Sequence, residues 1–506
     1  MSVIINDIFR KKAEELKAPL IETTVRPERI VVTEKDKDAF QGLSVIKKGD
    51  AVFPVEIKND EEIIFDFGDH FVGYLNISLG NDGLKRITDS PLKLLFTFGE
   101  FPLEIVTPPE EYKGGLGNGW LQNEERSYVF LPCKARLDRR YAFRYLKIRR
   151  TDNASFPVKI EDLSVTAVSA VREENAPVPG TNDEIFRKIY KMSVKTLKEC
   201  QQEVFEDGPK RDRRLWIGDL KLQAMTDYGI FRNLDLIKRC IYLFASATGE
   251  HRMVAPCIFP DSPPYVDEWT FCDYSLFFIS CLYDWYRNTG DISLIRELYP
   301  VAYTQFDVIK EKFIRKEKRI DLNCFIDWCP ELDKSTALLG VYIYALKQLK
   351  ELAELLGESA EAVKEEITAA AEILLSCFNE KTGLFVTPSG QISYHTQIWA
   401  VLSGVLTKEE AVSVLTAIKE YPTQFTMRTP YMMHYYIEAL YNSELKKEAL
   451  EFIKDKWGKM MSAGFDCCPE VFNTENQFES PYNAPEINSA CHAWSCTPAY
   501  WLKKLL

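Results

Sequence analysis

The chain divides into two stretches that differ in the spacing of their apolar residues. Between about residues 29 and 170, β-branched and aromatic residues alternate with polar ones, and Gly, Asp, Asn and Pro separate the runs. A period of two predicts strands that bury one face. The runs with this pattern are 62–68, 71–80, 92–101, 126–131 and 141–150. We expect them to form an antiparallel β-sandwich.

One segment of this first stretch lacks any periodic pattern. Residues 107–120 contain two prolines and four glycines, a composition that predicts a long loop. The simpler interpretation is a loop without a role. The alternative is that it reaches towards a neighbouring site.

The period changes to 3.6 residues after the segment 172–184, in which two prolines and a glycine precede Asn182, the expected N-cap of a first helix. We therefore predict a β-sandwich domain over residues 1–175 and a helical domain over residues 176–506. The predicted helices are 183–203, 217–230, 233–249, 268–289, 291–315, 334–356, 359–378, 392–404, 408–419, 429–442, 445–462 and 486–504.

These twelve helices fall into pairs of unlike character. Segments 270–286 and 489–502 are apolar over much of their circumference, whereas 361–378 is polar on one side. The alternation indicates inner helices surrounded by outer amphipathic ones. Six such pairs closing on themselves form an (α/α)6 barrel, a six-hairpin toroid with a pocket at one end of the inner helices. An open helical array is the alternative.

Composition narrows the range of partners. Apolar residues make up 46% and charged residues 27%, as in ordinary globular proteins, and the net charge of −12 includes no long charged run. We expect neither a nucleic-acid nor a membrane partner. The first twenty residues are too charged for a secretory signal, and no window resembles a membrane span.

Cysteine usage bears on the compartment. The thirteen cysteines follow no framework spacing, which favours reduced thiols and a cytoplasmic location. The pair Cys467 and Cys468 has no metal-ligand spacing around it, so we expect structural thiols and no metal.

The densest polar cluster lies between the first two predicted helices, over residues 206–219. If a helix began at Asp212, Trp216 and Asp219 would share one face with it, because they follow four and seven residues later. The alternative for such a charged loop is a surface network of salt bridges.

A second cluster lies near the end of the chain, over residues 465–495. Glu470 precedes a loop rich in Pro, Asn and Ser, and His492, one of five histidines, opens the last apolar segment. Trp269, Trp328 and Trp399 stand near the starts of inner helices, close to acids or a histidine. Packing in the core is the plainer interpretation of each alone. Together they fit a pocket in which indole faces stack on a sugar.

The segment from Asp207 to Asp219, DGPKRDRRLWIGD, resembles the signature of the α-L-rhamnosidases of glycoside hydrolase family 78. That signature runs Asp, Cys, Pro, any residue, Arg, Glu, Arg and, after two residues, Trp, any residue, Gly, Asp. Its spacing matches throughout. The resemblance covers nearly all of residues 60–506, through FDFG (65–68), FTFGEF (96–101), FRYLKI (143–148), DW (327–328), TPY (429–431) and CHAWS (491–495).

The resemblance implies inverting hydrolysis of terminal α-L-rhamnosides on an (α/α)6 barrel, without a cofactor. Asp212 stands at the position of the general acid and Glu470 at that of the general base. Other positions would bind the sugar or position the acid: Asp207, Arg211, Trp216, Asp219, Trp269, Trp328 and His492. Two departures are Asp212 in place of Glu and Gly208 in place of Cys. They affect fine specificity more than reaction class.

A proton donor must be protonated near neutral pH. The negative neighbours Asp207 and Asp219 would favour protonation of Asp212, whereas Arg211 and Arg213 would oppose it unless they point elsewhere. We therefore expect Arg211 to engage the sugar or another acid.

The expected substrates are small rhamnosylated saccharides or glycosides, and a homodimer is expected by analogy with compact members of the family. Two other enzyme classes use such a toroid, the unsaturated uronyl hydrolases and the inverting phosphorylases. A sugar-binding relative without turnover is the alternative from outside the enzymes, and the change from Glu to Asp at 212 favours it.

Overall fold

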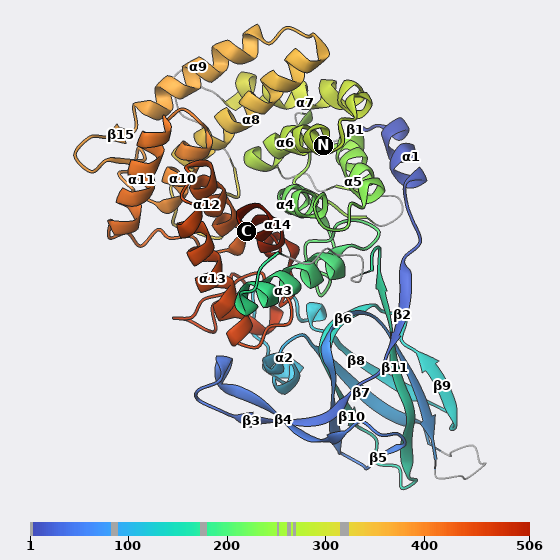
Figure 1. The fold of residues 1–506 in the computed structure, drawn as a ribbon. Coiled ribbons are helices and arrows are strands. Elements are labelled where there is room, and N and C mark those ends of the chain that lie inside the picture. Colours follow the sequence, from blue (N-terminus) through green and yellow to red (C-terminus); the bar gives the residue numbers. More distant parts are fainter. Residues whose placement is uncertain are drawn as a thin grey trace.

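The computed structural model places an antiparallel β-sandwich beside a larger helical domain (Figure 1). It describes residues 4–81, 90–172, 180–249, 252–260, 265–266, 270–313 and 323–506, with the side chains of 311–313 left aside. The predicted fold class is confirmed. The expected boundary between residues 175 and 176 lies outside the described residues and stays a prediction.

Ten strands of the described chain form the sandwich in the order β2-β11-β6-β10-β7-β8, with β3, β4, β5 and β9 beside this path. Their bounds are β2 (Ile21–Val25), β3 (Arg29–Lys35), β4 (Leu43–Asp50), β5 (Val55–Ile57), β6 (Glu62–Gly80), β7 (Leu92–Gly99), β8 (Asn123–Tyr128), β9 (Cys133–Arg136), β10 (Tyr141–Arg150) and β11 (Val158–Ser169).

Strand β6 connects the two layers. Its first half pairs with β10 and β3, and its second half pairs with β11 and β9. The chain turns at Gly68, whose φ of +80° is readily adopted only by glycine. The runs predicted as separate strands over 62–68 and 71–80 are therefore one strand.

The strands that the sequence predicts well are those in which apolar residues occupy every second position. In β7, Leu92, Leu94, Phe96 and Phe98 all point into the core of the sandwich and are at most 1% exposed. Burying a large apolar side chain contributes about 1.5–3 kcal/mol, so this face fixes the register of the strand.

The described part of the helical domain contains twelve α-helices. They are α3 (Glu184–Cys200), α4 (Ile217–Asp227), α5 (Leu234–Ser246), α6 (Cys272–Thr289), α7 (Ile292–Phe313), α8 (Ser335–Leu356), α9 (Glu361–Leu375), α10 (Tyr394–Leu402), α11 (Lys408–Glu420), α12 (Pro430–Asn442), α13 (Lys446–Ser462) and α14 (Pro498–Leu505).

The inner helices close into a ring. Contacts run from α4 to α6, α8, α10 and α12, and then through the 3-10 helix Ala493–Ser495 and α14 back to α4. Helices α3, α5, α7, α9, α11 and α13 pack around them. The toroid is thus closed, and an open array is excluded.

Of the predicted helices, the last differs most from the structure. Residues 486–504 were expected to be one helix, but α14 begins only at Pro498. Before it the chain runs beside the segment of Glu470, because the Glu470 amide donates to the Ser489 carbonyl and the His492 amide to that of Cys468, each at 2.9 Å. At the other end, Asp183 rather than Asn182 caps α3.

The first residues of the chain lie on the helical domain. Helix α1 (Asp7–Glu15) packs against α5, and β1 (Ile4–Ile5) pairs with β13 (Ala247–Thr248) (Figure 1). Among the described helices we find none that is both long and apolar enough to cross a membrane.

Candidate active site

A cavity of about 450 Å³ opens at the N-terminal ends of the inner helices. Loops before α4, α8 and α14 and the start of α6 line it, and the 107–120 loop of the sandwich adds Leu116 and Trp120. That loop therefore reaches the neighbouring domain, in agreement with the alternative interpretation of its sequence.

The cavity gathers most of the residues that the sequence singles out. Trp269 lies outside the described residues. The other eight all line the cavity: Asp207, Arg211, Asp212, Trp216, Asp219, Trp328, Glu470 and His492. Trp399 does not contribute, because it is 1% exposed and packs against Tyr435 in the helical core.

The signature segment is a closed loop followed by a helix. The Asp207 amide donates to the Arg214 carbonyl at 3.0 Å, and the Arg214 amide donates to Asp207 Oδ1 at 3.1 Å. Helix α4 begins at Ile217, so Asp212 and Trp216 precede it. The helical face proposed for Asp212, Trp216 and Asp219 is therefore wrong, and it is the loop that brings them together.

Two glycines of the signature lie at close contacts. A Cβ at Gly218 would come within 2.5 Å of the Tyr274 ring, so α4 and α6 can approach closely only with glycine there. A Cβ at Gly208 would lie 3.0–3.3 Å from Ser489, Cys491 and His492. At Gly208, where the family signature has Cys, the segment 489–492 therefore packs closely against the backbone.

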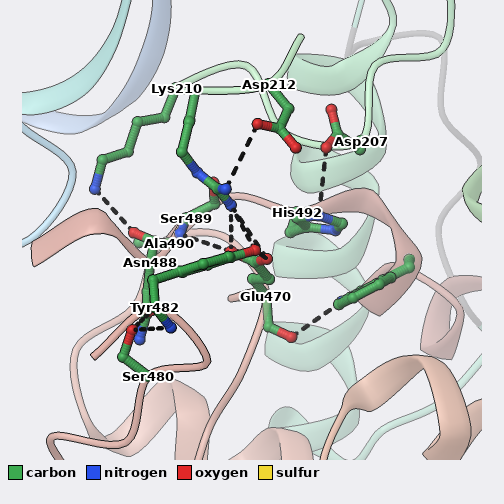
Figure 2. A network of polar contacts seen from close by, with 12 residues as sticks. Asp207, Lys210, Asp212, Glu470, Ser480, Tyr482, Asn488, Ser489, Ala490 and His492 are labelled. Atoms are coloured by element: carbon green, nitrogen blue, oxygen red, sulfur yellow. Dashed lines mark hydrogen bonds and ion pairs between the residues drawn. The ribbon is translucent and has the colours of Figure 1, made fainter. Parts of the chain in front are cut away.

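Glu470 is held by three donors (Figure 2). Arg211 Nη2 lies 3.2 and 3.1 Å from its two oxygens, the Tyr482 hydroxyl donates to Oε1 at 2.5 Å, and the Ser489 amide donates to Oε2 at 3.2 Å. Burial alone would raise the pKa of this carboxyl, but the charge of Arg211 and the hydrogen bonds outweigh it, and the pKa lies below its usual value. Glu470 is thus ionised at neutral pH.

Asp212 faces the same guanidinium from the other side (Figure 2). Its Oδ1 lies 3.5 Å from Arg211 Nη1, and its side chain is 18% exposed. The terminal nitrogens of a guanidinium are about 2.3 Å apart, so the nearest oxygens of Asp212 and Glu470 are separated by at most about 9 Å. Arg213 points away and donates from Nε to the Pro209 carbonyl at 2.9 Å.

Two further carboxyls and an imidazole complete the polar wall. Burial raises the pKa of Asp207 and Asp219 well above the usual value, and nearby carboxylates raise it further. His492 lies between them, with Nε2 3.9 Å from Asp207 and Nδ1 3.5 Å from Asp219. Burial lowers the pKa of His492 to about 4, so the ring is neutral at neutral pH.

Several polar atoms of this wall have no hydrogen-bond partner among the described residues. They are Arg211 Nε and Trp328 Nε1, together with Asp219 Oδ1 and His492 Nδ1, which face each other at 3.5 Å without a hydrogen bond. Buried polar groups are seldom left unpaired, and those that are need an explanation. A ligand rich in hydroxyl groups would supply both donors and acceptors at these positions.

Aromatic rings form the rest of the lining. Trp216 meets Tyr274 edge-on at 6.3 Å, and Trp328 meets Phe325 at 5.4 Å and Tyr482 at 5.9 Å. Rings in such tilted arrangements present flat faces on which the C–H bonds of a sugar can pack.

The sequence did not single out every residue of the site. Tyr482, Phe325, Trp494, Leu116 and Trp120 also line the cavity. Tyr482 lies in an irregular loop and Leu116 and Trp120 in the other domain, so neither period nor spacing could mark them. Trp494 does lie within the CHAWS block of the family resemblance.

Asp327, the acid that precedes Trp328, shapes the far side of the cavity. Its carboxylate contacts His395 Nε2 at 2.7 Å and accepts from the Thr429 hydroxyl at 2.6 Å and the Arg428 amide at 2.8 Å. It thereby joins the loop before α8 to α10 and to the start of α12, and so fixes the position of Trp328.

A closed helical toroid with acids, an arginine and aromatic rings at one mouth is the arrangement expected of an enzyme that acts on sugars. Residues 178–506 match the bacterial α-L-rhamnosidase six-hairpin glycosidase domain, and residues 27–167 match the N-terminal domain of glycosyl hydrolase family 78 α-rhamnosidases. The chain belongs to glycosyl hydrolase family 78 and is a glycosidase of the α-L-rhamnosidase type.

Solved structures agree with this assignment. The rhamnosidase from Klebsiella oxytoca with rhamnose bound is 35% identical, with a TM-score of 0.95 over 100% of this chain and 99% of that one. The family 78 rhamnosidase of Bacillus sp. GL1 is 19% identical, with a TM-score of 0.76 over 92% of this chain and 50% of that one. The Streptomyces avermitilis α-L-rhamnosidase complexed with L-rhamnose is 12% identical, with a TM-score of 0.66 over 96% and 44%. These last two share the fold. No curated protein sequence matches the chain.

Proposed function

We propose that the protein is an inverting exo-α-L-rhamnosidase that removes terminal L-rhamnose from small rhamnosides. The observation that carries the proposal is that Asp212 and Glu470 line one cavity and contact opposite ends of the Arg211 guanidinium. Inverting glycosidases hold their two carboxyls roughly 6.5–9.5 Å apart, so that a water molecule fits behind the sugar. The upper limit of about 9 Å is compatible with that spacing.

In the proposed reaction Glu470 takes a proton from water while the water oxygen attacks the anomeric carbon. The glycosidic C–O bond breaks, and Asp212 gives its proton to the departing oxygen. Arg211 and Tyr482 orient Glu470 through their hydrogen bonds. The proposed contacts to sugar hydroxyls come from Asp207, Arg211, Asp219 and His492, and the proposed stacking surfaces are Trp216 and Trp328, with Trp269 kept as a prediction.

The stereochemistry can be tested directly. Hydrolysis of p-nitrophenyl α-L-rhamnoside should release β-L-rhamnose first, and NMR recorded before mutarotation identifies the anomer. Because the upper limit on the carboxyl separation also admits the roughly 5–5.5 Å of retaining enzymes, α-L-rhamnose as the first product would refute inversion. Release of no rhamnose would refute the activity itself.

The pH profile should report the ionisation of Glu470. Since its pKa lies below the usual 4.5, the acid limb of kcat/KM should fall below about pH 4.5. Tyr482→Phe removes a donor to the ionised form, which raises that pKa and moves the acid limb to higher pH. Tyr128→Phe, in the sandwich and away from the cavity, is the control. A limb that stays in place in Tyr482→Phe would contradict the role given to Glu470.

We propose that the 107–120 loop contacts the aglycone. It is tied to the opposite wall, because the Gly115 amide donates to the Tyr482 carbonyl at 2.7 Å, and it presents Leu116 and Trp120 to the cavity. Trp120→Ala should raise KM about tenfold for rhamnosides with large aromatic aglycones and change it little for methyl rhamnoside. Trp120→Phe should restore most of the affinity. An equal change for both substrates would count against this role.

We also propose that the protein works in a reducing compartment, as a cytoplasmic enzyme and a homodimer. All thirteen cysteines are free thiols, and eleven of them are buried. Unpaired cysteines in this number support a reducing compartment. Light scattering of the full chain tests the dimer.

A further inference from the structure

A buried group of sulfur and nitrogen ligands lies behind the active site, where the two domains meet. His70 comes from β6 of the sandwich, Cys467 from the segment after α13, and Cys491 from the segment before α14. A ring nitrogen of His70 and the two Sγ atoms lie within 4.8 Å of one another. None of the three residues is more than 2% exposed.

The two ring nitrogens of His70 face two carboxylates. Nε2 lies 3.0 Å from Glu100 Oε1, while Nδ1 lies 3.9 Å from Glu199 Oε2 and makes no hydrogen bond in the part of the chain that the structure describes. Glu100 is itself fixed, because its Oε2 accepts from the Ala490 amide at 2.6 Å. Metal-binding histidines characteristically give one ring N–H to a carboxylate, which leaves the other nitrogen for the metal.

The surroundings can balance the charge of a divalent ion. Cys467 and Cys491 each carry a thiol, and zinc binds the thiolate form. A divalent cation would displace both protons, and two thiolates would neutralise its charge. The Sγ of Cys200 lies 4.0 Å from that of Cys491 but donates to the Asp207 carbonyl at 3.7 Å, so Cys200 is not counted among the ligands.

We propose that His70, Cys467 and Cys491 form a structural zinc site. Two thiolates and one imidazole are ligands that zinc prefers, and structural zinc sites are closed to solvent. This proposal is independent of the one for the reaction, since it concerns residues outside the cavity.

The site would stabilise the catalytic segments. Cys467 precedes Glu470 by three residues, and Cys491 is followed directly by His492. Those two segments are already hydrogen-bonded to each other, through the amides of Glu470 and His492. A metal held by both segments and by His70 would join the general base and a sugar-binding histidine to the sandwich.

The test uses the full chain expressed in zinc-supplemented medium and desalted without chelator. Elemental analysis should find about one zinc ion per chain. After refolding with Co²⁺ in place of Zn²⁺, thiolate-to-cobalt charge-transfer absorption should appear. Wild-type protein that holds no zinc and gives no cobalt band would overturn the proposal, as would a disulfide among Cys200, Cys467 and Cys491 in protein isolated under non-reducing conditions.

Variants then assign the ligands. Cys467→Ser and Cys491→Ser should each lower the zinc content at least about tenfold. Cys468→Ser is the matched control, because Cys468 is equally buried but contacts Ser193 and Thr196 instead. Zinc retained equally in Cys467→Ser and Cys468→Ser would also refute the site. The metal content of the wild-type chain decides the matter even if a variant does not fold.

Discussion

Glu470→Gln is expected to lower kcat for an aryl α-L-rhamnoside by about 10²–10⁴-fold, the usual contribution of a general base. Glutamine has the shape of glutamate but cannot take a proton from water. It also lacks the negative charge that Arg211 and the Tyr482 hydroxyl now stabilise. Steady-state kinetics with p-nitrophenyl α-L-rhamnoside measure the effect, and calorimetry with L-rhamnose shows whether sugar binding persists.

An assay with azide distinguishes the loss of the general base from a disrupted active site. Azide attacks without losing a proton, so it should restore turnover in Glu470→Gln and give the β-rhamnosyl azide. Glu475→Gln is the matched control, because Glu475 lies on the same segment but is exposed. If Glu470→Gln kept its rate within about threefold of wild type, Glu470 would not be the base.

The helices were predictable because their signal is local. An apolar stripe at a period of 3.6 residues must be buried whatever the partner, and the helix bounds mostly agree to within a few residues. The apolar pattern predicts the wrong structure where the backbone makes hydrogen bonds to a distant segment of the chain instead of forming a helix. Residues 488–492 hydrogen-bond to the Glu470 segment and are not helical, although their apolar pattern predicted a helix.

The strands that the sequence missed have a similar explanation. In β11 the pairing register shifts between Ile160 and Asp162, which interrupts the alternation of inward and outward residues. β4 is largely exposed and carries Lys47, Lys48 and Asp50, so it has no buried face to reveal it. Such strands are defined by their neighbours in the sheet.

The site was predictable where chemistry is dense within a short segment. Asp207, Arg211 and Asp212 lie together in one loop. The density of charged residues in that loop, between apolar helices, identified it in the sequence. Tyr482 and Trp120 reach the cavity only through tertiary structure. The cluster of His70 with Cys467 and Cys491 joins residues about four hundred positions apart, and the spacing of the cysteines could not reveal it.

Asp212→Asn should lower kcat in proportion to how much the leaving group needs a proton. For rhamnosides of alcohols and sugars we expect a loss of about 10²–10⁴-fold, because an alkoxide leaves poorly without protonation. For a dinitrophenyl rhamnoside the loss should be under about tenfold, because that phenolate departs unprotonated. A series of aryl and alkyl rhamnosides of graded leaving-group pKa measures the dependence.

Asp207, the acid next to Asp212 in the cavity, is the most informative residue to compare with it. Burial and adjacent carboxylates raise the pKa of Asp207, which favours its protonated form in the cavity. If Asp207 only binds the sugar, Asp207→Asn should slow every substrate by a similar factor. A loss in Asp207→Asn that grows with leaving-group pKa, together with a uniform loss in Asp212→Asn, would transfer the role of acid to Asp207. Asp212→Glu restores the residue of the family signature, and it should retain leaving-group behaviour like that of the wild type if position 212 is the donor.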